Sequence, residues 1–312
     1  MWAVMGMLAG MISLMQRTPR SAGMRQDRKP LDTNAKLLNG AIAATAGLIV
    51  IGLGIAFLQE AQAESRLTEA SANYSTPVMQ PIADEAPAME FAPMDETIER
   101  MNDDSKPWTM TVLGDSTGNN ENEWVQLVIR RLAERTGRPA EIHTWSVEAN
   151  SYGDTTDISG KGEPIIVWNG SASGMGADYS LEQIKTMAPE PSDLVVISHA
   201  HNHVSPETAL SGVRSLAEWA ESAWDTAPAL AVTLQNGRLD EQAGRQTEII
   251  GALRDNWEDT ESVALIDVFT AYKQADDVET LLRDDNFHPS DEGEEVWADT
   301  VWRDLDLDLV NS

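Results

Sequence analysis

From Trp108 onward, short apolar runs alternate with longer amphipathic stretches. The short runs have the length and composition of buried strands, and the longer ones repeat their apolar residues at helical spacing. Strands are predicted at 108–114, 140–147, 165–168, 194–198, 229–234 and 263–269. Helices are predicted at 122–136, 180–187, 206–224, 239–257 and 274–283, and a last helix is capped by Ser290 and ends near Leu305. This alternation predicts one α/β domain over 106–312, with a mostly parallel sheet of about five strands covered on both faces.

The chain before this domain has a different pattern. Residues 37–58 form a run of 22 residues without a charge, which is long enough to cross a bilayer. Because residues 1–36 are basic and acidic residues follow the run, the positive-inside rule places the N-terminus in the cytoplasm and the domain outside. Ala61-Gln62-Ala63 resembles a signal-peptidase site, so removal after Ala63 and secretion is the alternative. The length of the apolar run favours an uncleaved membrane anchor.

Residues 59–105 are rich in Ala, Pro, Met, Glu and Asp and show no sustained period. Such a composition offers few bulky apolar groups for a core. We therefore predict a mostly disordered acidic linker between the anchor and the domain.

Charge and composition narrow the classes of function. The net charge of −29 is uneven, with six basic and two acidic residues before residue 58, against 16 basic and 49 acidic residues after it. Binding to nucleic acid needs clustered Lys and Arg, so the acidic domain argues against it. The chain has no cysteine, which excludes disulfides and thiolate metal sites.

Polar stretches follow several predicted strands and mark the candidate site. They are Gly114-Asp115-Ser116, Asn169-Gly-Ser-Ala-Ser-Gly174, His199-Ala-His-Asn202-His203 and, just before the last helix, Asp285-Asn-Phe-His288. Ligand sites of such sheets lie at the carboxyl ends of the strands, so we expect these stretches to meet there.

The residue types in these stretches fit one reaction. Ser116 lies on a strand-to-helix turn, where a serine hydroxyl is exposed and suited to act as a nucleophile. His288 is the candidate base that takes its proton, and Asp285 is the candidate acid that orients the imidazole. The backbone N–H groups of Ser116 and Gly174 and the side-chain amide of Asn202 are candidate oxyanion-hole donors.

In order and spacing, these four blocks resemble the SGNH (GDSL) hydrolases, which are named for Ser, Gly, Asn and His in four blocks. The resemblance covers 106–312. It implies a three-layer α/β/α, flavodoxin-like fold and ester hydrolysis or acyl transfer without a metal or cofactor. The third block departs from the usual Gly-x-Asn-Asp, because here it is Ala200-His201-Asn202-His203. Thr117 stands where leucine is usual.

Three other readings of the sequence are open. His199, His201 and His203 alternate along the chain, so in an extended segment they would share a face and could hold zinc in a metal-dependent hydrolase. Gly114-Asp-Ser-Thr-Gly118 also fits the nucleophile elbow of α/β-hydrolases, but there the serine follows several strands. A non-catalytic, anchored binding module is the third reading. We favour an exported, anchored serine esterase that hydrolyses, or transfers, acyl groups of small esters, lipids or O-acylated cell-envelope glycans.

Overall fold

The computed structural model describes residues 89–258, 260 and 262–310 of the 312-residue chain. The predicted segment 1–36, the predicted anchor at 37–58 and most of the predicted linker lie outside the described residues. Among the described residues, no helix combines the length and the apolar character that a membrane span requires.

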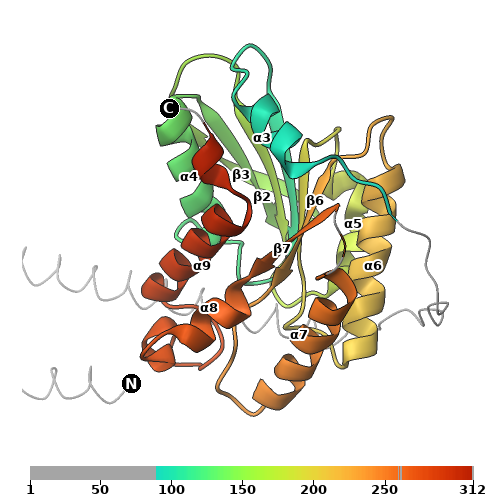
Figure 1. Cartoon of the computed structure of the whole chain (residues 1–312), viewed down its shortest axis with the longest axis vertical. Coiled ribbons are helices and arrows are strands. Elements are labelled where there is room, and N and C mark those ends of the chain that lie inside the picture. Colours follow the sequence, from blue (N-terminus) through green and yellow to red (C-terminus); the bar gives the residue numbers. More distant parts are fainter. Residues whose placement is uncertain (1–88, 259, 261, 311–312) are drawn as a thin grey trace, which may run out of the picture. The chain divides into compact units, whose positions relative to one another are not determined.

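A seven-stranded sheet in the order β3-β2-β4-β1-β5-β6-β7 forms the centre of the described domain (Figure 1). The strands are β1 (Trp108–Gly114), β2 (Ala140–Ser146), β3 (Ser151–Ile158), β4 (Ile165–Ser171), β5 (Leu194–Ser198), β6 (Ala229–Leu234) and β7 (Val263–Asp267). All neighbours are parallel except β2 and β3, which form an antiparallel pair. The predicted mostly parallel α/β sheet is confirmed.

The predicted count of about five strands is wrong. β3 is absent from the predicted strands because 151–158 is polar and has no apolar run. It lies at the edge of the sheet, where most of its side chains are exposed or half-buried, so its sequence lacks the pattern of a buried strand. The strand predicted at 263–269 also ends earlier, since Phe269 lies in the following helix.

Helices cover both faces of the sheet. They are α3 (Met94–Met101), α4 (Trp124–Thr136), α5 (Ala177–Met187), α6 (Pro206–Ser222), α7 (Ala243–Trp257), α8 (Val268–Gln274), α9 (Asp291–Asp304) and the short 3-10 helices η1 (Val278–Leu281) and η2 (Leu307–Leu309). In Figure 1, α4, α8 and α9 lie on one side of the sheet and α5, α6 and α7 on the other. The layers therefore follow the α/β/α arrangement that the resemblance implies.

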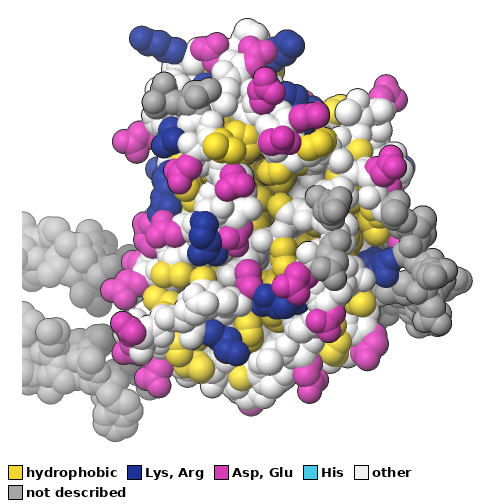
Figure 2. Space-filling view, in the orientation of Figure 1, with side chains coloured by type: hydrophobic (Ala, Val, Ile, Leu, Met, Phe, Trp, Pro, Cys, Tyr) yellow, Lys and Arg dark blue, Asp and Glu magenta, His cyan; other side chains and the backbone are white. Residues whose placement is uncertain are grey.

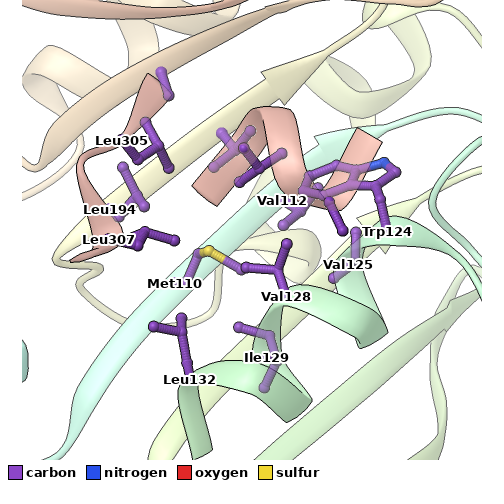
Figure 3. Close-up of a cluster of buried hydrophobic side chains, with 14 of the residues drawn as sticks. Met110, Val112, Trp124, Val125, Val128, Ile129, Leu132, Leu194, Leu305 and Leu307 are labelled. Atoms are coloured by element: carbon purple, nitrogen blue, oxygen red, sulfur yellow. The ribbon is translucent and has the colours of Figure 1, made fainter. Parts of the chain in front are cut away.

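Alternation along each strand divides the core into two clusters. Met110 and Val112 of β1 face α4, where Figure 3 shows them against Val128 and Ile129. Leu113 points to the opposite face and joins the cluster under α5, α6 and α7. Because β1 is buried on both faces, its turn at Gly114 starts from the centre of the domain.

Helix α3 lies within the stretch that the sequence predicts as a disordered linker. Its Ile98 and Met101 side chains are buried in the same cluster as Met110. The indole N–H of Trp108 donates to the carbonyl oxygen of Thr97 at 3.2 Å. The sequence pattern does not predict this helix, because the stretch has few apolar residues and they lie on only one face of the helix. The C-terminal end of the predicted linker is thus part of the domain.

Candidate active site

The ends of three central strands bring the first three polar stretches together. Gly114 at the end of β1 is paired with Ser171 of β4 on one side and with Ser198 of β5 on the other. The Ala172 N–H donates to the Gly114 carbonyl oxygen at 2.9 Å, which extends the contact beyond the strand end. The loops that contain Ser116, Gly174 and Asn202 therefore leave adjacent strands at the same edge of the sheet.

The turn that holds Ser116 is fixed by its neighbours. Asp115 is buried, and its Oδ1 accepts from the N–H of Thr117 at 3.2 Å and from the Thr117 hydroxyl at 2.9 Å. Asn169 Nδ2 donates to the Gly118 carbonyl oxygen at 2.7 Å. Burial raises the pKa of Asp115 to about 6. The hydrogen bonds of the buried Asp115 thus stabilise the turn from the core side, while Ser116 itself is half-buried.

Ser116, His288 and Asp285 form a continuous hydrogen-bonded chain. Ser116 Oγ lies 2.9 Å from His288 Nε2, and His288 Nδ1 lies 2.7 Å from Asp285 Oδ2. Asp285 Oδ1 accepts from the backbone N–H groups of Phe287 and His288, each at 2.9 Å. Burial raises the pKa of Asp285, but the hydrogen bonds from His288 and from these backbone groups outweigh it and lower that pKa. A lowered pKa keeps the carboxylate ionised beside the imidazole.

The loop between Asp285 and His288 is compact because Asn286 adopts a left-handed backbone conformation with φ of 59°. The Asn286 N–H donates to the Arg283 carbonyl oxygen at 2.9 Å, and the Arg283 N–H donates to the His288 carbonyl oxygen at 2.8 Å. An antiparallel bridge between Leu282 and Pro289 closes its base. This tight turn explains how two side chains three residues apart reach each other.

The predicted oxyanion donors lie on the two loops beside the Ser116 turn. Gly174 has a φ of 74°, a conformation that favours glycine. Asn202 Nδ2 donates to the carbonyl oxygen of Met175 at 3.0 Å, which joins the third polar stretch to the second. This bond uses one of the two N–H groups of the amide. Asn202 and Gly174 are both half-buried, so solvent reaches both residues.

The three histidines of the third stretch do not converge. Their Nε2 atoms have different partners, namely Ser180 Oγ at 2.9 Å for His199, Asn236 Oδ1 at 3.1 Å for His201 and the Ala177 N–H at 3.3 Å for His203. Burial lowers their pKa values to about 3, 3 and 4, respectively. Among the described residues no group of three His, Asp or Glu side chains is arranged for a metal ion. The alternation assumed for a zinc site fails because 199–203 is a turn after β5 and not an extended strand.

Sequence reasoning missed two residues that contact this region. Gln235 and Asn236 are fully buried at the end of β6, and Asn236 Nδ2 donates to the carbonyl oxygen of Phe287 at 3.0 Å. The pattern that revealed the other stretches was also present here, because a polar pair directly follows the apolar run 229–234.

Acidic side chains are spread over the face of the domain seen in Figure 2, with Lys and Arg scattered among them. No basic patch is visible on that face. This distribution agrees with the uneven charge of the sequence.

No model of a known protein family and no curated protein sequence matches this chain. Solved structures do. A two-domain esterase active on acetylated mannans has a TM-score of 0.50 at 13% identity, over 69% of this chain and 52% of its own. A lipase/acylhydrolase from Enterococcus faecalis has a TM-score of 0.47 at 16% identity, over 64% of this chain and 95% of its own. A member of the lipolytic G-D-S-L family from Veillonella parvula has a TM-score of 0.46 at 12% identity, over 64% and 97%.

This chain thus spans about half the length of the two-domain esterase. At such low identity the likeness concerns the fold alone. The likeness shows that the described part of this chain shares the fold of that esterase, and its layers and strand order agree with the α/β/α fold that the sequence resemblance to the SGNH (GDSL) hydrolases implies.

Proposed function

We propose that this chain is a serine ester hydrolase in which Ser116 is the nucleophile. The observation that carries the proposal is the hydrogen-bonded chain from Ser116 Oγ through His288 to Asp285, with contacts of 2.9 and 2.7 Å. A nucleophile, a base within hydrogen-bonding distance and a group that orients the base are the three parts that acyl transfer requires.

The reaction follows from this geometry. His288 Nε2 takes the proton of Ser116 Oγ as the oxygen attacks the ester carbonyl carbon, and Asp285 stabilises the imidazolium through Nδ1–H. The carbonyl oxygen becomes an oxyanion, to which the N–H groups of Ser116 and Gly174 and the amide of Asn202 donate. His288 then returns the proton to the leaving alcohol, and an acyl–serine remains. Water attacks the acyl group with His288 again as the base, which releases the acid.

The proposed substrate class rests on the expected location of the domain outside the membrane and on its structural likeness to a solved esterase. The apolar run 37–58, preceded by basic residues, supports an anchor that leaves the domain outside the membrane. The two-domain esterase with the same fold is active on acetylated mannans. Both points favour acetyl or short acyl esters on extracellular or cell-envelope glycans over long-chain lipids. Small soluble esters then serve as model substrates.

The activity is tested with the full chain in detergent and p-nitrophenyl acetate. Wild type should release p-nitrophenol, and Ser116→Ala should lower kcat by at least about 10⁴-fold, because alanine has no hydroxyl with which to form the acyl–enzyme. Ser215→Ala, which changes a half-buried serine on α6 outside the four polar stretches, is the matched control. Equal rates for Ser116→Ala and wild type would refute the proposed nucleophile.

The location has its own test. Alkaline carbonate extraction of membranes should leave the full-length chain in the pellet, because an apolar span of this length partitions into lipid. Release of the full-length chain into the supernatant contradicts the anchor. A mature protein whose N-terminus is residue 64 would instead support secretion after cleavage.

A further inference from the structure

A buried polar cluster at the end of β6 connects three of the four polar stretches of the site. Its centre is Gln235 and Asn236, which we call the β6 amide pair, and both side chains are fully buried. A buried amide is costly unless its hydrogen bonds are satisfied, so the partners of this pair show what it holds together.

Gln235 joins the Ser116 turn to the third stretch. Its Nε2 donates to Thr117 Oγ1 at 3.2 Å and to the carbonyl oxygen of Ser198 at 3.0 Å. Its Oε1 accepts from the backbone N–H of His201 at 3.0 Å. Thr117 Oγ1 in turn donates to Asp115 Oδ1, within the turn that presents Ser116. Gln235 thus connects the turn after β1 with the turn after β5.

Asn236 joins the third stretch to the loop that contains His288. Its Nδ2 donates to the carbonyl oxygens of Gly237 at 2.9 Å and of Phe287 at 3.0 Å. Because Nδ2 is the donor on that side, Oδ1 is the acceptor for His201 Nε2, 3.1 Å away. The His201 ring therefore carries its hydrogen on Nε2. Burial lowers the pKa of His201 to about 3, so this neutral tautomer persists over the whole physiological range.

His201 is the residue that both amides share. Its backbone N–H bonds to Gln235 and its ring bonds to Asn236. Its ring also packs against Phe287, with centroids 4.7 Å apart. Phe287 directly precedes His288, so the ring contact of His201 and the hydrogen bond from Asn236 Nδ2 both reach the residue next to the proposed base. These contacts give His201 a structural role in the site that does not depend on a metal ion.

We propose that Asn236, His201 and Gln235 are positioning residues that hold the His288 loop at hydrogen-bonding distance from Ser116. This inference rests on the proposed esterase function, because it assigns the cluster a role in that reaction. The residues act through His288 and do not touch the substrate. A displacement of a catalytic group by about 1 Å lowers the rate on the order of 100-fold, so the effect is measurable.

The test compares two Asn236 variants with a control on the same strand. Asn236→Leu removes both sets of hydrogen bonds at similar volume, and Asn236→Asp keeps the Oδ1 acceptor but replaces the donor to Phe287 with a carboxylate oxygen. Thr233→Val is the control, because Thr233 Oγ1 is buried on β6 with no hydrogen-bond partner among the described residues. Both Asn236 variants should lower kcat for p-nitrophenyl acetate by about 10- to 100-fold with KM within about twofold. Thr233→Val should leave both unchanged.

A second measurement separates positioning from a general effect on the fold. The rate at which a fluorophosphonate labels Ser116 is measured for Asn236→Leu with His288 present and with His288→Ala. If Asn236 acts through His288, the substitution slows labelling only when His288 is present. An equal slowing in both backgrounds would show a structural role and overturn the inference.

The outcomes also distinguish this inference from the proposed function. Wild type that is not labelled at Ser116 would contradict the esterase itself. Wild type that is labelled, with Asn236→Leu and Asn236→Asp labelled and turning over at the wild-type rate, would contradict only the positioning role. Should Asn236→Leu fail to fold, Asn236→Asp, which has the same shape, still gives the kcat comparison.

Discussion

Ser116 and His288 face each other across the site, but the chain holds them in different ways. The Ser116 turn continues directly from β1, which is buried on both faces and paired on both sides. His288 lies on a loop before α9 in which residues 283–286 are exposed. That loop is held by its own backbone hydrogen bonds and by contacts from the segment after β6, including the Leu239 N–H to the Asn286 carbonyl oxygen at 2.8 Å.

This difference has a consequence for substitutions. The Ser116 turn continues from a strand that is buried in the core. A substitution that moves Ser116 must therefore also disturb the sheet. The position of His288 depends on a few local hydrogen bonds, each contributing about 1 kcal/mol. Changes that break these hydrogen bonds or strain the backbone of the 283–288 loop should therefore reduce activity while the domain stays folded. The predictions below test this contrast from the largest expected effect to the smallest.

Asp285→Asn is expected to abolish most of the activity without unfolding the domain. Its Oδ1 would still accept from the backbone N–H groups of Phe287 and His288, so its NH₂ would face His288 Nδ1. That forces the hydrogen onto Nε2, which can then no longer accept the proton of Ser116. In a serine protease the same change costs about 10⁴-fold in kcat, and we expect a loss of that order here.

The neighbouring acid provides the control for that prediction. Asp284→Asn removes an exposed carboxylate without touching the imidazole and should keep kcat within about twofold of wild type. Steady-state kinetics on p-nitrophenyl acetate, with circular dichroism to confirm folding, decide the matter. An Asp284 variant as impaired as the Asp285 variant would mean that the orienting acid has been misassigned.

Asn286→Val should lower activity by a smaller factor through backbone strain. Residue 286 has φ of 59°, which a β-branched side chain adopts at a cost of about 1–3 kcal/mol. A loop strained by about 1.4 kcal/mol populates its active arrangement roughly tenfold less. Asn286→Gly accepts the same φ and should stay near the wild-type kcat. Similar kcat values for the Val and Gly variants would show that the shape of this turn does not set the position of His288.

Asp115→Asn tests the Ser116 side through stability alone. The pKa of the buried Asp115 carboxyl is raised to about 6 from 3.8, so the folded protein holds this proton more tightly than the unfolded chain. The stabilisation is complete below about pH 4 and is lost as the pH rises through about 6. Asparagine has no proton to lose. The free energy of unfolding of Asp115→Asn, relative to wild type, should therefore increase between pH 4 and pH 7.

Denaturant unfolding at the two pH values measures this change. Asp154→Asn on the exposed edge strand β3 is the control and should differ from wild type by the same amount at both pH values. A difference between Asp115→Asn and wild type that is independent of pH would contradict the raised pKa.

The sequence was most informative where packing is regular. The buried strands at 194–198 and 229–234 match the structure residue for residue, because continuous apolar runs bounded by polar turns have few alternatives. Ser290 caps α9 through a hydrogen bond from the Gly293 N–H, as its position before the last helix predicts. The edge strand β3 and helix α3 were missed, since both expose a polar face and neither has a long apolar run.

For the candidate site, the proposed catalytic residues could be predicted from the sequence, but the residues that support them could not. Ser116, Asp285 and His288 have few substitutes in such a reaction, and the spacing of Asp285 and His288 indicated that one loop holds both. Gln235 and Asn236 follow an apolar run, as the other polar stretches do, but their residue types indicate no reaction, because the role of a buried amide depends on partners that lie far away in the sequence. The alternation of the histidines at 199, 201 and 203 suggested a shared face that the structure does not show, because alternation in sequence does not fix where the rings point in a turn.

The most direct test of the account is to label the full chain with a fluorophosphonate and to map the modified residue by mass spectrometry. A fluorophosphonate reacts with a serine whose hydroxyl is activated by a neighbouring base, and the fluoride leaves as the serine oxygen bonds to phosphorus. We predict a single adduct on Ser116, which forms much more slowly, but still at a measurable rate, in His288→Ala. An adduct on another serine, or none on an otherwise folded protein, would contradict the proposal that Ser116, His288 and Asp285 form the active site.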